Sequence, residues 1–180
     1  MSATLEEVEP VIVAARRKID RADFVRAKEL ARQVLEENYV IKLPVLASQL
    51  AKAYGLEVVE GVFKPEHINV AGFIDFDKKT IAVNSADSAP RKNFTIAHEL
   101  GHYLLEHSIE DGYTVLLRNT DDMVRTPIEQ EANCFAANVL VPEPFLRDYL
   151  IQYPRVTDEQ LAGVFGVSVA VIRFRKLSMR

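Results

Sequence analysis

The chain has one cysteine, four histidines and no long apolar segment. A lone cysteine, Cys134, cannot form a disulfide within the chain. The stretch from Met1 to Pro10 carries glutamates where a secretory signal would have lysine and an apolar run. No apolar run approaches the ~20 residues that cross a bilayer. We therefore expect a cytoplasmic protein without a role in membranes.

Neither sign of charge predominates strongly, because the formal net charge is -4 at pH 7. That balance gives no overall attraction to nucleic acid or to anionic lipid. Basic residues do gather near both ends of the chain, and we interpret them as solvated helix faces. With 180 residues and 48% hydrophobic content, the chain has the size of one domain, with room for a small appendage.

Two of the few histidines lie one helical turn apart, in His98-Glu99-Leu100-Gly101-His102. Positions i and i+4 of a helix share a face, so both imidazoles can bind one ion. Glu99 lies about a quarter turn round, where its carboxylate can take a proton from water whose pKa zinc lowers to about 7. The motif therefore predicts two zinc ligands and a general base, although the pattern also arises by chance on amphipathic helices.

Hydrophobic periodicity predicts a largely helical chain with a short sheet. Gly101 costs its helix about 1 kcal/mol relative to alanine, and a close neighbour over that turn would explain it. Residues 108–126 show no sustained period and predict a long connection beside the metal site. The expected helices cover 22–38, 44–54, 88–106, 128–140 and 145–149. Thr157 to Gln160 resembles a capping box that begins a further helix, and a last helix runs to about 176. The expected strands cover 56–60, 70–76 and 80–84.

A catalytic zinc site normally needs a third protein ligand and an open position for water. Spacing leaves that ligand open, because Glu129 and Glu131 lie on nearly opposite sides of the helix expected over 128–140. His107 lies roughly 140° round the helix from His102, so we expect it to support the site or the fold instead of binding the ion. His67 is interpreted as a surface residue of a loop.

Two segments together resemble the ImmA/IrrE family of metallopeptidases. They are Phe94-Thr95-Ile96-Ala97-His98-Glu99-Leu100-Gly101-His102-Tyr103-Leu104-Leu105 and Glu131-Ala132-Asn133-Cys134-Phe135-Ala136, the latter followed by Leu140-Val141-Pro142. The resemblance extends over most of the chain. It implies that Glu131, which opens the second segment, is the third ligand beside His98 and His102, with Glu99 as the catalytic base.

The resemblance also implies a gluzincin-like α+β fold. A zincin-like metallopeptidase domain over residues 1–150 would hold a small, mostly antiparallel sheet and the active-site helix. Residues 151–180 would form a helical, helix-turn-helix-like subdomain packed on it. His107, Glu129 and Asn133 are candidates for the shell around the ligands. Candidates for stabilising an oxyanion are Tyr103, Tyr113 and Arg118.

The implied activity is that of a zinc-dependent endopeptidase, with manganese as a possible substitute. It would make a specific cut in a helix-turn-helix repressor of the Xre type and so release genes of a mobile element or a stress response. An exposed edge of the hairpin over 70–84 could pair with the extended substrate. The alternative with the same fold is a partner-binding component of a toxin-antitoxin pair that does not cut.

A DNA-binding regulator is the other alternative, because Leu161 to Ile172 resembles the core of a helix-turn-helix. The early positions of its second helix, Val167 to Val171, offer none of the arginine, asparagine or glutamine contacts that read bases. We therefore expect this segment to be a packing module and expect no direct, sequence-specific binding of nucleic acid.

Overall fold

The computed structural model describes residues 21–64, 69–107, 113–117 and 126–179, and for 113–117 only the path of the backbone. His67 and Arg118, which the sequence singled out, lie outside these ranges. The elements in chain order are α1 (Phe24–Glu37), α2 (Ala47–Ala53), β1 (Glu57–Gly61), β2 (Val70–Asp75), β3 (Thr80–Asn84), α3 (Ala89–Leu104), β4 (Tyr113–Leu117), α4 (Pro127–Leu140), α5 (Glu143–Gln152), α6 (Asp158–Phe165) and α7 (Val169–Ser178).

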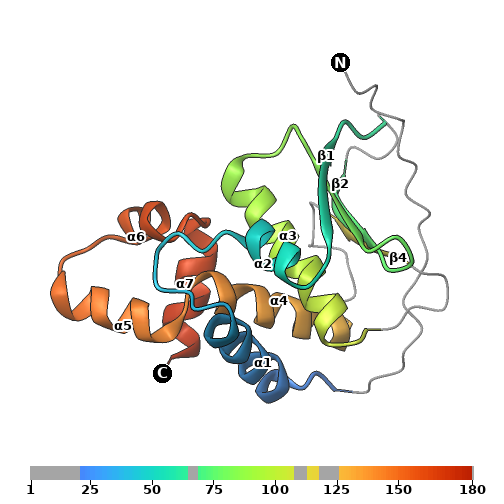
Figure 1. Cartoon of the computed structure of the whole chain (residues 1–180). Helices are drawn as coiled ribbons and strands as arrows, with labels where there is room; N and C mark the ends of the chain where they lie inside the picture. The colour runs from blue at the N-terminus through green and yellow to red at the C-terminus, as the bar shows by residue number, and fades with distance from the viewer. Residues whose placement is uncertain (1–20, 65–68, 108–112, 118–125, 180) are drawn as a thin grey trace.

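The described strands form one sheet in the order β1-β3-β2-β4. β1 runs parallel to β3, whereas β2 is antiparallel to both β3 and β4. This mixed α+β architecture with a mostly antiparallel sheet confirms the fold class expected from the sequence. Figure 1 shows the sheet at one end of the molecule, with α5, α6 and α7 at the other and α3 and α4 between them.

The hairpin over β2 and β3 occupies the middle of the sheet. Each of its strands is paired on both sides, so the expectation that the hairpin offers a free edge to substrate is wrong. The edges of the described sheet are β1 and β4. β4 itself lies within the segment that we expected to be an unstructured connection, because the run from Tyr113 to Leu117 pairs with β2.

Helix α3 lies against the sheet on one side and against α4 on the other. Two glycines allow these close approaches. A Cβ at Gly72 of β2 would lie 2.5 Å from Cγ2 of Thr95 on α3. A Cβ at Gly101 of α3 would lie 2.9 Å from Cδ1 of Phe135 on α4, which confirms the close neighbour expected over that turn. The two glycines thus allow α3 to pack closely on both the sheet and α4.

Helix α4 packs on α1, α3 and α7. Its core face carries Ile128, Ala132 and Phe135, all buried. Pro127 begins the helix, and the side chain of Thr126 accepts a hydrogen bond from the backbone N–H of Glu129 at 3.4 Å. Since α4 begins there, its first turn lies beside the middle of α3, where the two histidines are.

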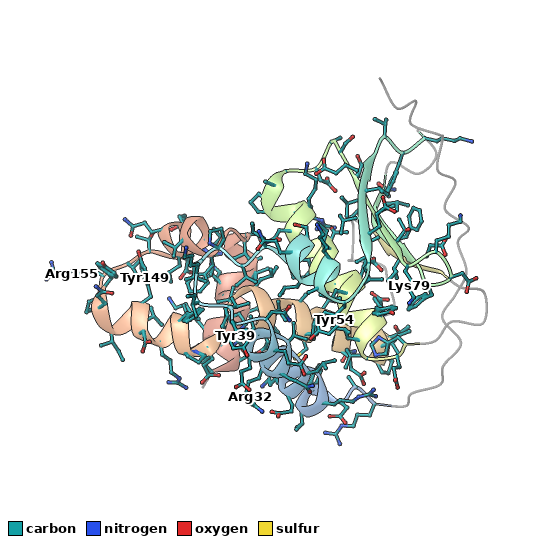
Figure 2. All side chains as sticks on the ribbon, viewed as in Figure 1. Arg32, Tyr39, Tyr54, Lys79, Tyr149 and Arg155 are labelled. Atoms are coloured by element: carbon teal, nitrogen blue, oxygen red, sulfur yellow. The ribbon has the colours of Figure 1, made fainter. Side chains whose placement is uncertain are left out.

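The N-terminal helices cover the same core. Tyr54, which follows α2, donates a hydrogen bond from its hydroxyl to Glu37 of α1 at 2.7 Å, and Figure 2 labels this tyrosine near α1. Burial, followed by the charge and hydrogen bond of Glu37, raises the pKa of Tyr54 to about 12. This contact ties α2 to the end of α1.

Local sequence signals mark both ends of α6. Thr157 and Gln160 form the expected capping box at the start of α6. Gly166 ends that helix with φ of 64°. Arg175 of α7 is 1% exposed and donates from Nε to the carbonyl oxygen of Val141 at 3.0 Å, which fastens α7 to the end of α4. Among the described residues, no helix has the length and apolar character that a membrane span requires.

Candidate metal centre

Helix α3 presents His98, Glu99 and His102 in its second half. All three side chains are fully buried, and the two imidazoles lie one turn apart on one face, as the spacing predicts. The rings stand edge to face with centroids 4.6 Å apart. Their Nε2 atoms lie 2.9 Å from each other, so both point at one position.

Glu129 completes this group from the first turn of α4. Its two carboxylate oxygens lie 3.2 Å from Nε2 of His98 and 3.2 Å from Nε2 of His102. Tetrahedral zinc ligands at 2.0–2.2 Å from the ion are separated from each other by about 3.3 Å. The group therefore has the donor atoms and nearly the spacing that a zinc ion requires, and it can hold one.

The hydrogen bond of His98 leaves its Nε2 free to bind an ion. Oδ1 of Asn133 lies 3.1 Å from Nδ1 of His98. An amide oxygen only accepts hydrogen bonds, so Nδ1 carries the hydrogen and Nε2 presents its lone pair. Asn133, one of the candidates for the shell around the ligands, therefore lies where it can orient the ring of His98.

A longer chain of contacts, through His107 and Glu131, likewise leaves Nε2 of His102 free to bind an ion. Nε2 of His107 lies 2.8 Å from Oε2 of Glu131, and the carboxylate can only accept. A neutral His107 must then accept at Nδ1, which lies 3.0 Å from Nδ1 of His102. His102 therefore donates from Nδ1 and presents the lone pair of Nε2 to the position beside Glu129.

Glu131 is held in turn by the start of α1. The backbone N–H of Asp23 donates to Oε1 of Glu131 at 2.7 Å. Nearby, a terminal guanidinium nitrogen of Arg26 donates to the carbonyl oxygen of Leu105 at 3.1 Å. The first turn of α1 is thus joined to the outer part of the metal centre, a contact between segments more than one hundred residues apart that no local sequence pattern reveals.

The structure places Glu129, and not the expected third ligand Glu131, beside the two histidines. Glu131 is 2% exposed and contacts His107 and Asp23, whereas Glu129 reaches the two histidines. Residues two apart on a helix point in nearly opposite directions, and the rotation of α4 decides between them. The polar pair Glu129 and Asn133, one turn apart, was the available signal, because Glu131 falls on the apolar face with Ile128 and Ala132.

Burial and neighbouring charges both shift the pKa values of His98, His102 and Glu129. Burial lowers the pKa of His102 to about 4, despite the opposing charge of Glu129. Burial also acts to lower the pKa of His98, but Glu129 and Glu99 outweigh it and raise that pKa. The pKa of Glu129 lies well below its usual range, since the two imidazoles outweigh the effect of burial. A neutral His102 beside an ionised Glu129 matches the states in which these groups bind metal.

Glu99 lies in the same buried region of α3, and its charge acts on His98. As the residue after the first histidine, it lies beside the ligand group and not within it. Of the candidates for stabilising an oxyanion, Tyr103 is partly buried with its ring stacked on Phe76, the centroids 6.3 Å apart. For Tyr113 only the backbone is described.

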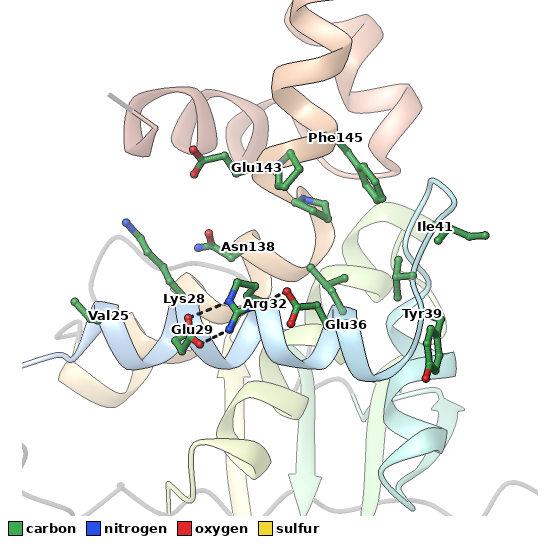
Figure 3. A pocket seen from close by; sticks show the side chains of 14 residues that line it. Val25, Lys28, Glu29, Arg32, Glu36, Tyr39, Ile41, Asn138, Glu143 and Phe145 are labelled. Carbon is green, nitrogen blue, oxygen red and sulfur yellow. Dashed lines mark hydrogen bonds and ion pairs between the residues drawn. The ribbon is translucent and has the colours of Figure 1, made fainter.

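Two grooves are lined in part by residues of α4. One, of about 620 Å³, runs between α1 and the start of α5, and none of the residues discussed above as ligands lines it. Figure 3 shows Arg32 between Glu29 and Glu36 on its wall, with Tyr39 and Ile41 at one end. Another, of about 590 Å³, is lined by residues of α3, α4 and α7 and includes Asn133. The second groove therefore adjoins the metal centre.

Comparison with known proteins gives these residues a family. The model of the IrrE N-terminal-like domain matches residues 51–176. The chain is 26% identical over 106 residues to the metallopeptidase ImmA of Bacillus subtilis (strain 168), which covers 58% of this chain and 61% of that protein. It is 31% identical over 100 residues to the radiation response metalloprotease IrrE of Deinococcus radiodurans, covering 52% of this chain and 25% of that protein.

A solved structure described as a Mycobacterium tuberculosis transcriptional regulator shares the fold. Its TM-score is 0.61 at 20% identity, and the match covers 84% of this chain and 46% of that one. The chain thus spans three fifths and one quarter of the two curated relatives. Because the family model matches well over half of the sequence, the resemblance is confirmed. The chain belongs to the IrrE N-terminal-like domain family of metallopeptidases.

Proposed function

We propose that this protein is a zinc-dependent endopeptidase in which His98, His102 and Glu129 hold the ion. The observation that supports this most directly is the convergence of both Nε2 atoms on the carboxylate of Glu129. The hydrogen bonds at Nδ1 of the two histidines leave these nitrogens ready to ligate. A catalytic zinc site needs this set of three ligands and an open position.

Zinc bound there would supply Lewis acidity, polarising a scissile carbonyl and lowering the pKa of water to about 7. Glu99 is the residue that we assign to proton transfer. Its carboxylate would take a proton from the attacking water and pass it to the leaving amine. Its burial beside His98 keeps bulk water away from that exchange. Asn133 and His107 would hold the two imidazoles in orientation.

The substrate that we propose is a helix-turn-helix repressor of the Xre type, cut at one position. The family resemblance supports this choice. Such a cut would release genes of a mobile element or a stress response. A helix-turn-helix repressor encoded beside the gene of this protein would be the first candidate to purify and test.

The deciding experiment compares wild type with Glu99→Gln in the presence of zinc. Metal analysis should give about one zinc per chain for both proteins, whereas only wild type should cut the repressor into two fragments seen by mass spectrometry. Removing a general base should slow the reaction at least a hundredfold. Glu57→Gln, an exposed change on β1, is the matched control and should cut normally.

Two other outcomes would replace this proposal. Tight binding of the repressor without cleavage by wild type would make the protein a binding partner, as in a toxin-antitoxin pair. Salt-sensitive, sequence-selective binding of DNA by the protein alone would make it a regulator. Full cleavage by Glu99→Gln would contradict the role of Glu99.

A further inference from the structure

The groove of about 590 Å³ that adjoins the metal centre has an apolar lining built from distant segments. Phe94 comes from α3, Cys134 from α4, Val171 and Phe174 from α7, and Phe24 from the start of α1. Phe24 and Phe174 are 46% and 47% exposed, so they leave apolar surface at the groove that the fold itself does not bury. A volume within ~300–1,000 Å³ is typical of a ligand site.

Two residues of the groove contact His98 of the metal centre, although no candidate ligand lines the groove itself. Asn133 lines it and lies 3.1 Å from Nδ1 of His98. Phe94 also lines it, and its ring centroid lies 6.4 Å from that of His98. A group in this groove would therefore sit one imidazole ring away from the ion.

We propose that this groove receives a large apolar side chain of the substrate, such as phenylalanine, leucine or methionine, next to the bond that is cut. The inference rests on the proposed endopeptidase function and adds the selectivity of its site.

This assignment gives the early positions of α7 a function other than reading DNA. Ser168, Ala170 and Val171 face the groove, and they are small or apolar. They contribute to its lining together with Phe94 and Cys134. The C-terminal helices, fastened to α4 through Arg175, would then contribute to the choice of substrate.

The test uses a synthetic peptide library with one varied position and two readouts. Zinc-loaded wild type is assayed for cleavage, and zinc-loaded Glu99→Gln is assayed for peptide retention. Both readouts should be enriched for large apolar residues over alanine by at least about tenfold. Ala170→Phe, which narrows the groove from an exposed position, should move the preference to small residues. Leu177→Ala, on the same helix at 65% exposure and not in the lining, is the control and should keep the preference.

The two readouts separate the selectivity from the activity. Retention with the apolar preference but without cleavage would contradict the endopeptidase function and keep the groove as a peptide site. Cleavage without the preference, or a preference that Ala170→Phe leaves unchanged, would overturn the groove proposal alone. Neither cleavage nor retention of any peptide would overturn both.

Discussion

The Nδ1 atoms of His102 and His107 lie 3.0 Å apart, and the hydrogen between them belongs to His102. This follows from Glu131, which accepts the Nε2 hydrogen of His107 and leaves that ring only an acceptor at Nδ1. A carboxylate outside the ligand group thereby sets the tautomer of a candidate ligand. The start of α1 holds that carboxylate through the N–H of Asp23.

The first prediction concerns this contact. His107→Phe leaves the buried Nδ1 hydrogen of His102 without an acceptor, so its ring should lose its orientation and zinc affinity should fall about 10- to 100-fold. His107→Gln offers an amide oxygen as an acceptor and should recover much of the loss. Competition with a chromophoric chelator measures both constants. Equal zinc affinity in wild type and His107→Phe would contradict the supporting role of His107.

The second prediction separates the two glutamates of α4. Glu129→Gln removes the proposed ligand, and zinc should no longer remain at one per chain after gel filtration. Glu131→Gln changes a residue that contacts His107 and Asp23 and leaves the proposed ligands in place, so zinc should still bind, about 10- to 100-fold more weakly. Both substitutions keep the shape of the side chain, and circular dichroism should show both variants folded. The reverse order of losses would make Glu131 the ligand after all.

Local patterns in the sequence predicted most of the helices and strands. At the metal centre they predicted the two histidines but not the glutamate that lies beside them. The spacing of His98 and His102 predicted their shared face, because helical geometry alone determines it. The choice between Glu129 and Glu131 depends on how α4 is rotated against α3, and that rotation is set by packing such as Phe135 over Gly101. Local spacing does not contain this information.

Long-range contacts explain the other differences. The contact of Asp23 with Glu131 joins positions far apart in the chain, so periodicity carries no trace of it. β4 was missed although Tyr113 to Leu117 has aromatic and β-branched residues, because its strand character depends on pairing with β2. The edge of the sheet likewise follows from that pairing. The capping box of α6, by contrast, is local, and the sequence was sufficient to predict it.

The third prediction tests the close packing of α3 on α4. Gly101→Ala would bring a Cβ to within 2.9 Å of Phe135, and overpacking of this kind costs about 1–3 kcal/mol. Gly163→Ala is the matched control, since no atom lies within 4 Å of its Cβ position on α6. It should stabilise the protein by up to about 1 kcal/mol through helix propensity. Denaturant unfolding measures both. Adding Phe135→Leu to Gly101→Ala should recover part of the loss if the ring is the obstacle.

The last prediction concerns removal of the metal. A ligand that binds only the folded chain stabilises it by about 2.7 kcal/mol at one hundred times its Kd, and in a chain of this size each kcal/mol raises Tm by about 2–4 °C. Zinc added to chelator-treated protein should therefore raise Tm by about 5–10 °C. Manganese at the same concentration should raise it less, because it binds nitrogen ligands more weakly. Magnesium should have little effect, since it prefers six oxygen ligands. Glu129→Gln should lose most of the zinc-dependent rise, and an unchanged rise in that variant would place the ion elsewhere.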